Sequence, residues 1–302
     1  MQQLVRLSSV SPWVLIALAA TFAYTANPSA SHAAATCTDG VRAKVTTPFV
    51  GVPYVSGTDV ETKFARLEKV LRACNDRRSV FLSVYLVVTK TINAKINTGS
   101  FKNRAWMDKY LTGFANAYRD AFTNYEAKRF DNVPSSWKVA FDIAAGGKHL
   151  FVQDLLLGMN AHINYDLANT VYGIGVGTGA DRDSRYADHA SVTGILSTLV
   201  DDELAVLGKY YASVYASFSD DLQELSGKVA MGGIAPAREH AWKVAVSMAD
   251  ARNGPTTIRS QLNHEAGGAA IAIAAPAKLP GVITILTRAE AGYWPVRSHS
   301  VP

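Results

Sequence analysis

The sequence predicts an all-α fold: a single domain whose helices form a bundle around one central apolar helix, preceded by a short extended N-terminal arm. Apolar residues recur at three- and four-residue spacings along most of the chain, which places them on one face of a helix. Hydrophobic residues make up 48% of the 302 residues and charged residues 18%, a balance that suits a protein with a substantial core. A chain of this length is enough for one large domain.

The first 35 residues have the pattern of a secretory signal peptide. Arg6 gives a weakly basic start, and Trp13–Ala23 form an apolar run of signal-peptide length. Small residues follow and end in Ala33–Ala35, a cleavage site of the A-x-A type. Polar residues and a proline interrupt the run before the roughly 20 apolar residues that a membrane anchor needs. We therefore expect residues 1–35 to be removed near Ala35, leaving a secreted, extracellular or cell-surface protein without a transmembrane anchor.

The two cysteines, Cys37 and Cys74, both lie in the mature chain. In an oxidising compartment an even pair predicts one disulfide. It would tie the arm, residues 36–58, to the end of the first helix. The alternatives are two unpaired thiols or a lipidated Cys37, and Thr36 argues against lipidation because a small Gly or Ala normally stands at that position.

The predicted helical domain spans residues 59–275, and the pattern justifies its first helices in turn. Residues 36–58 are rich in Thr, Val, Gly and Pro, which predicts the extended arm or a short hairpin. A first helix begins at Asp59. The apolar, β-branched run 80–96 fits a buried helix or a strand, and the helical context favours a helix. Residues 103–128 show the clearest helical period, with aromatic residues on one face: Trp106, Tyr110, Phe114, Tyr118 and Phe122.

The second half begins with a short helix over 136–145, which Gly146 and Gly147 interrupt. The central helix is expected at 148–169 and a glycine-rich loop after it, beginning near Gly173. The remaining helices are predicted at 187–217, from Pro236 onward, and at 256–275, and the tail 276–302 is expected to be irregular.

The central helix carries the most informative stretch, Leu155–Ala168. Its flanks are apolar almost all the way round, which predicts burial, yet it contains four polar side chains: Asn160, His162, Asn164 and Asp166. His162 and Asp166 are four residues apart and so share one face of a helix. Buried polar groups need partners, so this segment is the candidate functional site, with His162 and Asp166 as candidate catalytic residues and the two asparagines lining it.

A metal site is the first hypothesis for this segment. His162 and Asp166 offer a nitrogen and an oxygen ligand for Zn²⁺ or another divalent ion. Further ligands are expected from Asp183, Asp188 and His189 after the loop. The alternative is a structural His–Asp hydrogen bond in the core.

Acid–base chemistry without a metal is the second hypothesis, in which Asp166 orients His162. No G-x-S-x-G elbow or reactive cysteine supplies a nucleophile. The loop 173–179 has alternating glycines, but it follows no predicted strand, so it fails the context test for a nucleotide-binding loop. It would serve as a mobile lid or as a plain connector.

Charge gives little direction about partners. The net charge is +5, and no run of Lys and Arg is long enough to form a nucleic-acid track, so no nucleic-acid partner is expected. The candidate partner is a small-molecule or lipid-like substrate.

The segment GMNAHINYDLA, Gly158–Ala168, resembles the hallmark of a widespread family of uncharacterised bacterial and fungal helical proteins, a domain of unknown function. The resemblance covers residues 60–255 and implies a helical fold, with no established activity to transfer. Its other motifs are a W-x-x-A-F segment, acidic residues after the central helix and an R-x-x-A-W segment, matched here by Trp137, Ala140 and Phe141, by Asp181, Asp183 and Asp188, and by Arg238, Ala241 and Trp242.

His-x-x-x-Asp on a buried helix also resembles, more distantly, the zinc-binding helices of all-α secreted phospholipase C and P1-type nuclease enzymes. This chain lacks the further His that follows their Asp and the mature N-terminal Trp that binds zinc in them. The sequence therefore leads to two functional hypotheses. One is a secreted, metal-dependent hydrolase that uses His162 and Asp166, and the other is a non-catalytic secreted ligand-binding or structural protein.

Overall fold

The computed structural model describes residues 37, 39–213, 215, 220–251, 254–275 and 290. Over these residues the protein is helical and contains no strand, which confirms the all-α fold. The predicted signal peptide, 1–35, lies outside the described residues, as does the predicted tail, 276–302, except for Glu290.

The expected extended arm is wrong, because residues 39–50 form a helix. Helix α1 covers Asp39–Val50, and a short turn leads to α2, Gly57–Ala73. Threonine hydroxyls of α1 bond back to carbonyls one turn earlier, such as Thr46 Oγ1 to the Arg42 carbonyl at 2.9 Å. The composition favours an extended chain, but tertiary contacts outweigh so weak a preference.

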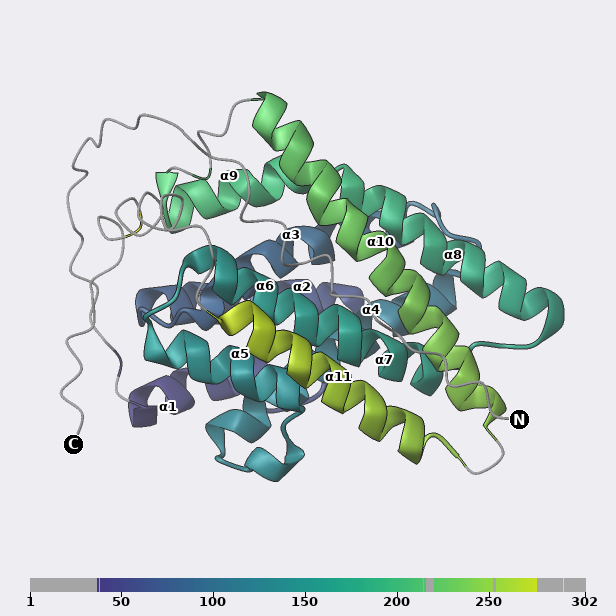
Figure 1. The fold of residues 1–302 in the computed structure, drawn as a ribbon, viewed down its shortest axis with the longest axis horizontal. Helices are drawn as coiled ribbons and strands as arrows, with labels where there is room; N and C mark the ends of the chain where they lie inside the picture. The colour runs from purple at the N-terminus through teal and green to yellow at the C-terminus, as the bar shows by residue number, and fades with distance from the viewer. Residues whose placement is uncertain are drawn as a thin grey trace.

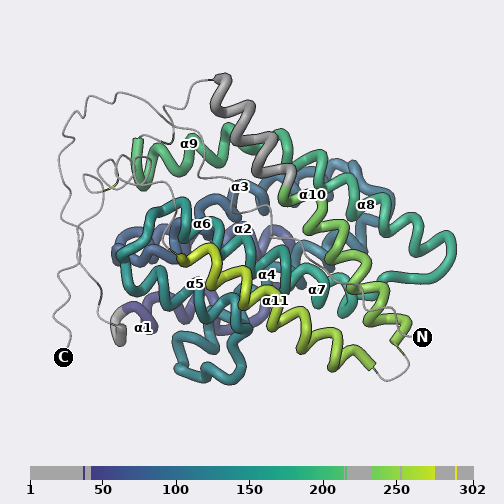
Figure 2. The backbone as a smooth tube through the Cα atoms, in the orientation of Figure 1, coloured from purple at the N-terminus to yellow at the C-terminus, as the bar shows by residue number. Residues whose placement is uncertain are grey.

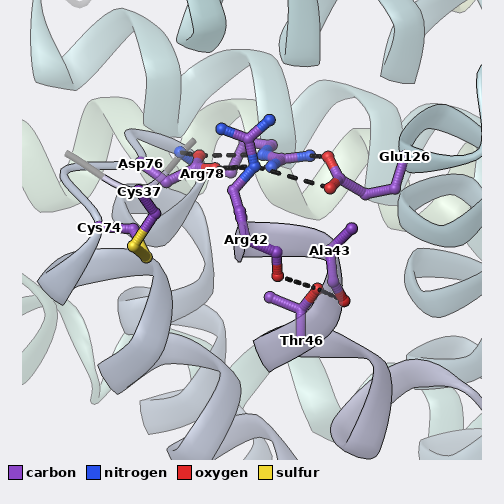
Figure 3. Close-up of a disulfide and its surroundings, with 8 residues drawn as sticks. All are labelled: Cys37, Arg42, Ala43, Thr46, Cys74, Asp76, Arg78 and Glu126. Carbon is purple, nitrogen blue, oxygen red and sulfur yellow. Dashed lines mark hydrogen bonds and ion pairs between the residues drawn. A yellow bond between two sulfur atoms is a disulfide. The ribbon is translucent and has the colours of Figure 1, made fainter. Parts of the chain in front are cut away.

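Those contacts hold α1 at both ends. Cys37 is disulfide-bonded to Cys74, the residue that ends α2, so the predicted disulfide is confirmed (Figure 3). Arg42 lies 3.4 Å from the Asp76 carboxylate and 3.6 Å from that of Glu126, and at the other end Val50 is buried in the core.

The next helices follow the expectation. Helix α3 covers Arg78–Asn97, so the ambiguous apolar run is a helix, and α4 covers Arg104–Glu126. A single 3₁₀ turn, η2, follows at Phe130–Asn132. Within the described residues, α3 alone is long and apolar enough to cross a membrane, and 61% of its most apolar stretch is buried inside the domain. It is best explained as a core helix.

The central helix contains one turn of π-helix. Helix α5, Ser135–Gly146, ends at Gly147, whose φ of 62° is in the left-handed region that glycine tolerates. Then α6, Phe151–Ala161, passes through the π-turn η3, His162–Asp166, into α7, Leu167–Ile174.

The glycine-rich loop is shorter than expected, because α8 already begins at Gly179 and runs to Ser197. The predicted helix 187–217 is interrupted at residues 198–199, and α9 covers Val200–Tyr210. Pro236 lies inside α10, Asp220–Asp250, instead of opening it. Helix α11, Thr256–Ala274, agrees with the prediction.

The central helix joins two halves of the core. Its first part, α6, packs against α3, α5 and α11, while α7 packs against α4 and α10 (Figure 1). One apolar cluster surrounds Phe81 and Trp137, and the other surrounds Leu167 and Trp242. Helices α8 and α10 lie side by side, and α1 lies at the other end of the domain (Figure 2). The π-turn therefore lies between the two apolar clusters.

Breaking the disulfide is expected to lower the free energy of unfolding by about 4 kcal/mol, since the bond closes a loop across a sequence separation of 37 residues. Urea unfolding of Cys37→Ser/Cys74→Ser and of the wild type with and without reductant measures the loss. Free-thiol labelling of the unreduced, denatured protein should find no thiol. Equal stability of the reduced and oxidised protein would contradict the role given to this bond.

Candidate functional site

The π-turn brings His162 and Asp166 together on one buried face. His162 Nδ1 lies 2.9 Å from Asp166 Oδ2, and each residue is only 3% exposed. A π-turn widens the helix by one residue and is found frequently at functional sites. The pair is therefore held by the backbone of a single irregular turn.

Trp137 completes the arrangement from α5. Its indole N–H donates to Asp166 Oδ2 at 2.7 Å, and its ring stacks on Phe141 with centroids 5.1 Å apart. One carboxylate oxygen thus contacts both the imidazole and the indole. Sequence reasoning noticed Trp137 only as a motif residue, because nothing in its spacing connects it with an aspartate 29 positions later.

Aromatic rings enclose the imidazole, and we call Phe81, Tyr85, Phe114 and Trp137 the aromatic box. Phe114 stacks on His162 with centroids 3.4 Å apart, and Tyr85 approaches it edge-on at 4.4 Å. Phe81 and Trp137 lie at 5.6 and 6.0 Å. Within this box, His162 Nε2 and the Tyr85 hydroxyl are buried and have no hydrogen-bond partner among the residues that the structure describes.

Burial favours the uncharged forms of His162, Asp166 and Tyr85. It lowers the pKa of His162 and raises the pKa of Asp166, and the Trp137 N–H only partly opposes the rise. If Nδ1 carries the proton, Nε2 is an acceptor; if Asp166 is protonated and donates to Nδ1, Nε2 is a donor. Burial also raises the pKa of Tyr85, so its O–H remains a donor.

The asparagines of the segment have structural partners. Asn160 donates to the Ala266 carbonyl at 2.9 Å, and Asn164 donates to Asn160 Oδ1 at 2.8 Å. They tie the central helix to α11. Gly158 has a packing role, since a Cβ there would lie 2.4 Å from the Phe81 ring.

The remaining predicted ligands are engaged elsewhere or lie at the surface. Asp188 accepts from the backbone N–H of Lys102 and of Asn103, at 2.8 and 2.7 Å, and so fixes the entry to α4. His189 lies 3.0 Å from the Tyr110 hydroxyl and 3.0 Å from the Arg238 carbonyl, one through each ring nitrogen. Asp183 is exposed on α8.

The structure therefore does not assemble the predicted metal ligands. Among the residues that it describes, no three His, Cys, Asp or Glu side chains are placed to hold a metal ion. The physical reason is that α8 begins directly after the loop, so its polar residues cap α4 and pair with α4 and α10. Only His162 and Asp166 of that set lie together.

Comparison with known proteins gives one match. A model of a family of unknown function, DUF5995, matches residues 58–276, which include the central helix and the whole aromatic box. No curated protein and no solved structure matches the chain.

Removing the indole N–H should cost stability. We expect Trp137→Phe to lower the free energy of unfolding by about 1–3 kcal/mol, the usual cost of leaving a buried acceptor without its donor. Trp242→Phe is the matched control, because the Trp242 ring is also buried and its N–H makes no hydrogen bond to a residue that the structure describes. Equal losses in the two variants, measured by urea unfolding, would show that the contact with Asp166 contributes nothing.

The pH dependence of stability should reveal the raised pKa of Asp166. Folding then retains a proton that the unfolded chain releases, so this stabilisation is complete below about pH 4 and is lost as the pH rises toward the folded pKa. Asp166→Asn does not titrate and still accepts from Trp137. The free energy of unfolding of Asp166→Asn, relative to that of the wild type, should therefore rise between pH 4 and pH 8. A constant difference across that range would mean that the Asp166 pKa is the same in both states.

Proposed function

This chain belongs to the DUF5995 family of unknown function, and we propose that it binds a small molecule through His162 inside the aromatic box. One observation carries the proposal: in the described part of the chain, His162 Nε2 is buried without a hydrogen-bond partner, although the neighbouring polar groups of the same segment are paired. The ligand would supply the missing partner.

An unpaired buried polar atom costs about 1–3 kcal/mol, so its presence calls for an explanation. Here the cost falls on two neighbours, His162 Nε2 and the Tyr85 hydroxyl, whose rings are 4.4 Å apart. A purely structural His–Asp pair needs only Nδ1. The second nitrogen and the phenol are left for another molecule.

The box also indicates what kind of molecule would fit. Its walls are aromatic rings, and burial keeps His162, Asp166 and Tyr85 uncharged, so an ion would be desolvated without a counter-charge. The ligand is therefore apolar over most of its surface and has a hydroxyl or amine for His162. Since Phe114 lies directly on the imidazole, a side chain of the box must move before the ligand enters.

Hydrolysis is the second candidate function, and the contact between Asp166 and His162 favours it. A carboxylate that orients one imidazole nitrogen leaves the other to act as a base or as a metal ligand. Zn²⁺ at Nε2 would need further ligands, and the described residues place no suitable group of three there. Ligand binding needs no such addition and is the better supported function.

We also propose that the protein is exported. The Cys37–Cys74 disulfide supports an oxidising compartment, and the predicted signal peptide would supply the route.

Phenol and toluene are matched probes for the binding site, because they have nearly the same size and differ by one hydroxyl. Phenol should bind the wild-type protein several-fold more tightly than toluene, as one net hydrogen bond implies. His162→Phe should abolish the difference, and Tyr85→Phe should reduce it. Isothermal titration calorimetry measures the affinities. Equal affinity for both probes in the wild type would refute the proposed role of His162.

Metal analysis separates the two candidate functions. We expect purified mature protein to contain no stoichiometric zinc, with the same result for His162→Phe and after treatment with a chelator. One equivalent of zinc that disappears in His162→Phe would instead support the metal-dependent hydrolase.

Export predicts a shortened chain. Mass spectrometry of the protein recovered outside the cell should show loss of about the first 35 residues, the length of the predicted signal peptide. An extracellular product that still begins at Met1 would overturn this prediction.

A further inference from the structure

A small cavity lies against the aromatic box. About 10 Å³ of it is accessible to the centre of a water molecule, which is room for roughly one water. Phe81 and Trp137 line this cavity and also contact His162, so the cavity and the box share two walls. The other lining residues that matter here are Tyr118, Asp154 and Gly158.

Two of the described residues that line this cavity carry buried polar atoms with no hydrogen-bond partner in the described part of the chain, the Tyr118 hydroxyl and Asp154 Oδ1. The second oxygen of Asp154 accepts from Arg77 Nε at 2.5 Å, and Arg77 also donates to the His149 carbonyl. Arg78, the other cation of the lining, is paired with Asp76 and Glu126. The cavity thus offers an acceptor and a phenolic donor, and both of its arginines are already paired.

Of the two walls that the cavity and the box share, Trp137 is hydrogen-bonded to Asp166, whereas the Phe81 ring has no polar group to hold it. The Phe81 ring centroid is 5.7 Å from that of Tyr118 on the cavity side and 5.6 Å from that of His162 in the box. The ring lies almost on the backbone of α6, a position that exists only because Gly158 has no Cβ. Moving this one ring would open the cavity toward His162 and leave a space about the size of a benzene ring.

We propose that Phe81 is the gate of the site, and that the ligand is a single-ring molecule with a hydrogen-bonding group at each end. This inference rests on the proposed function. One end would bind His162, and the other would donate to Asp154 and accept from Tyr118. The ligand is neutral or cationic, because both arginines of the lining are already paired with carboxylates and leave no counter-charge for a buried anion.

Three probes with the same ring test this ligand class: 4-hydroxybenzyl alcohol, with a hydroxyl at each end, p-cresol, with one, and 4-hydroxybenzoate, an anion. Calorimetric affinities would be measured for the wild type and for Phe81→Ala, with Phe81→Leu in reserve if the alanine variant does not fold. Opening the gate should tighten binding of the two neutral probes at least tenfold. The diol should exceed p-cresol by about fivefold, the ratio that one net hydrogen bond gives.

Tyr118→Phe in the Phe81→Ala background should reduce the preference for the diol, because it deletes one of the two groups, the Tyr118 hydroxyl and Asp154 Oδ1, that would bind the second hydroxyl. Tyr125→Phe is the control, since the Tyr125 hydroxyl bonds to Asp142 and is not part of the cavity lining. The anion should bind most weakly of the three probes.

Equal affinity for the diol and p-cresol in Phe81→Ala would overturn the inference and identify the cavity as the site of one bridging water. In that case, p-cresol affinity would also be measured after His162→Phe is added to Phe81→Ala. A loss of affinity there would leave the proposed function standing. A diol preference that is undiminished in Tyr118→Phe, or an anion that binds best, would also overturn the ligand class. If no probe bound either protein, both proposals would fail.

Discussion

The contacts of one buried oxygen, Asp166 Oδ2, hold the centre of this fold together. It accepts the Trp137 N–H from α5 and lies beside His162 Nδ1 across the π-turn. A carboxyl group inside an apolar core is stable only when it is hydrogen-bonded or uncharged, and here both conditions apply. The turn that carries it lies where the two apolar clusters meet. The position of the imidazole, and with it the aromatic box, follows from this contact.

Most of the other characteristic residues of the central segment serve the packing around this contact. Gly158 allows Phe81 to lie on α6, and Asn160, supported by Asn164, fixes α11. His162 Nε2, by contrast, makes no hydrogen bond with any described residue of the segment or its neighbours. Packing and hydrogen bonds therefore explain nearly every polar group of the segment except this ring nitrogen, which can still form a hydrogen bond. For that reason we place function at this atom.

The sequence predicted the helical class, the disulfide and the buried central helix, because these depend on local periodicity and on counting cysteines. It did not predict α1, where the disulfide and the Arg42 ion pairs outweigh a composition that favours an extended chain. The predicted metal ligands do not lie together, for a related reason. Asp188 and His189 follow the central helix closely in sequence, but their partners lie on or beside α4 and on α10. Contacts between distant segments, such as that of Trp137 with Asp166, leave no mark in residue spacing.

The central claim is that His162 Nε2 is the atom that meets a ligand, while Nδ1 is reserved for Asp166. Nitrogen NMR of protein labelled with ¹⁵N-histidine reads the two ring nitrogens separately. The account predicts that adding phenol shifts the Nε2 resonance of His162 and leaves the hydrogen bond between Nδ1 and Asp166 intact, whereas toluene has no such effect on Nε2. An Nε2 resonance that does not respond to phenol would contradict the claim and leave His162 as a structural residue of the core.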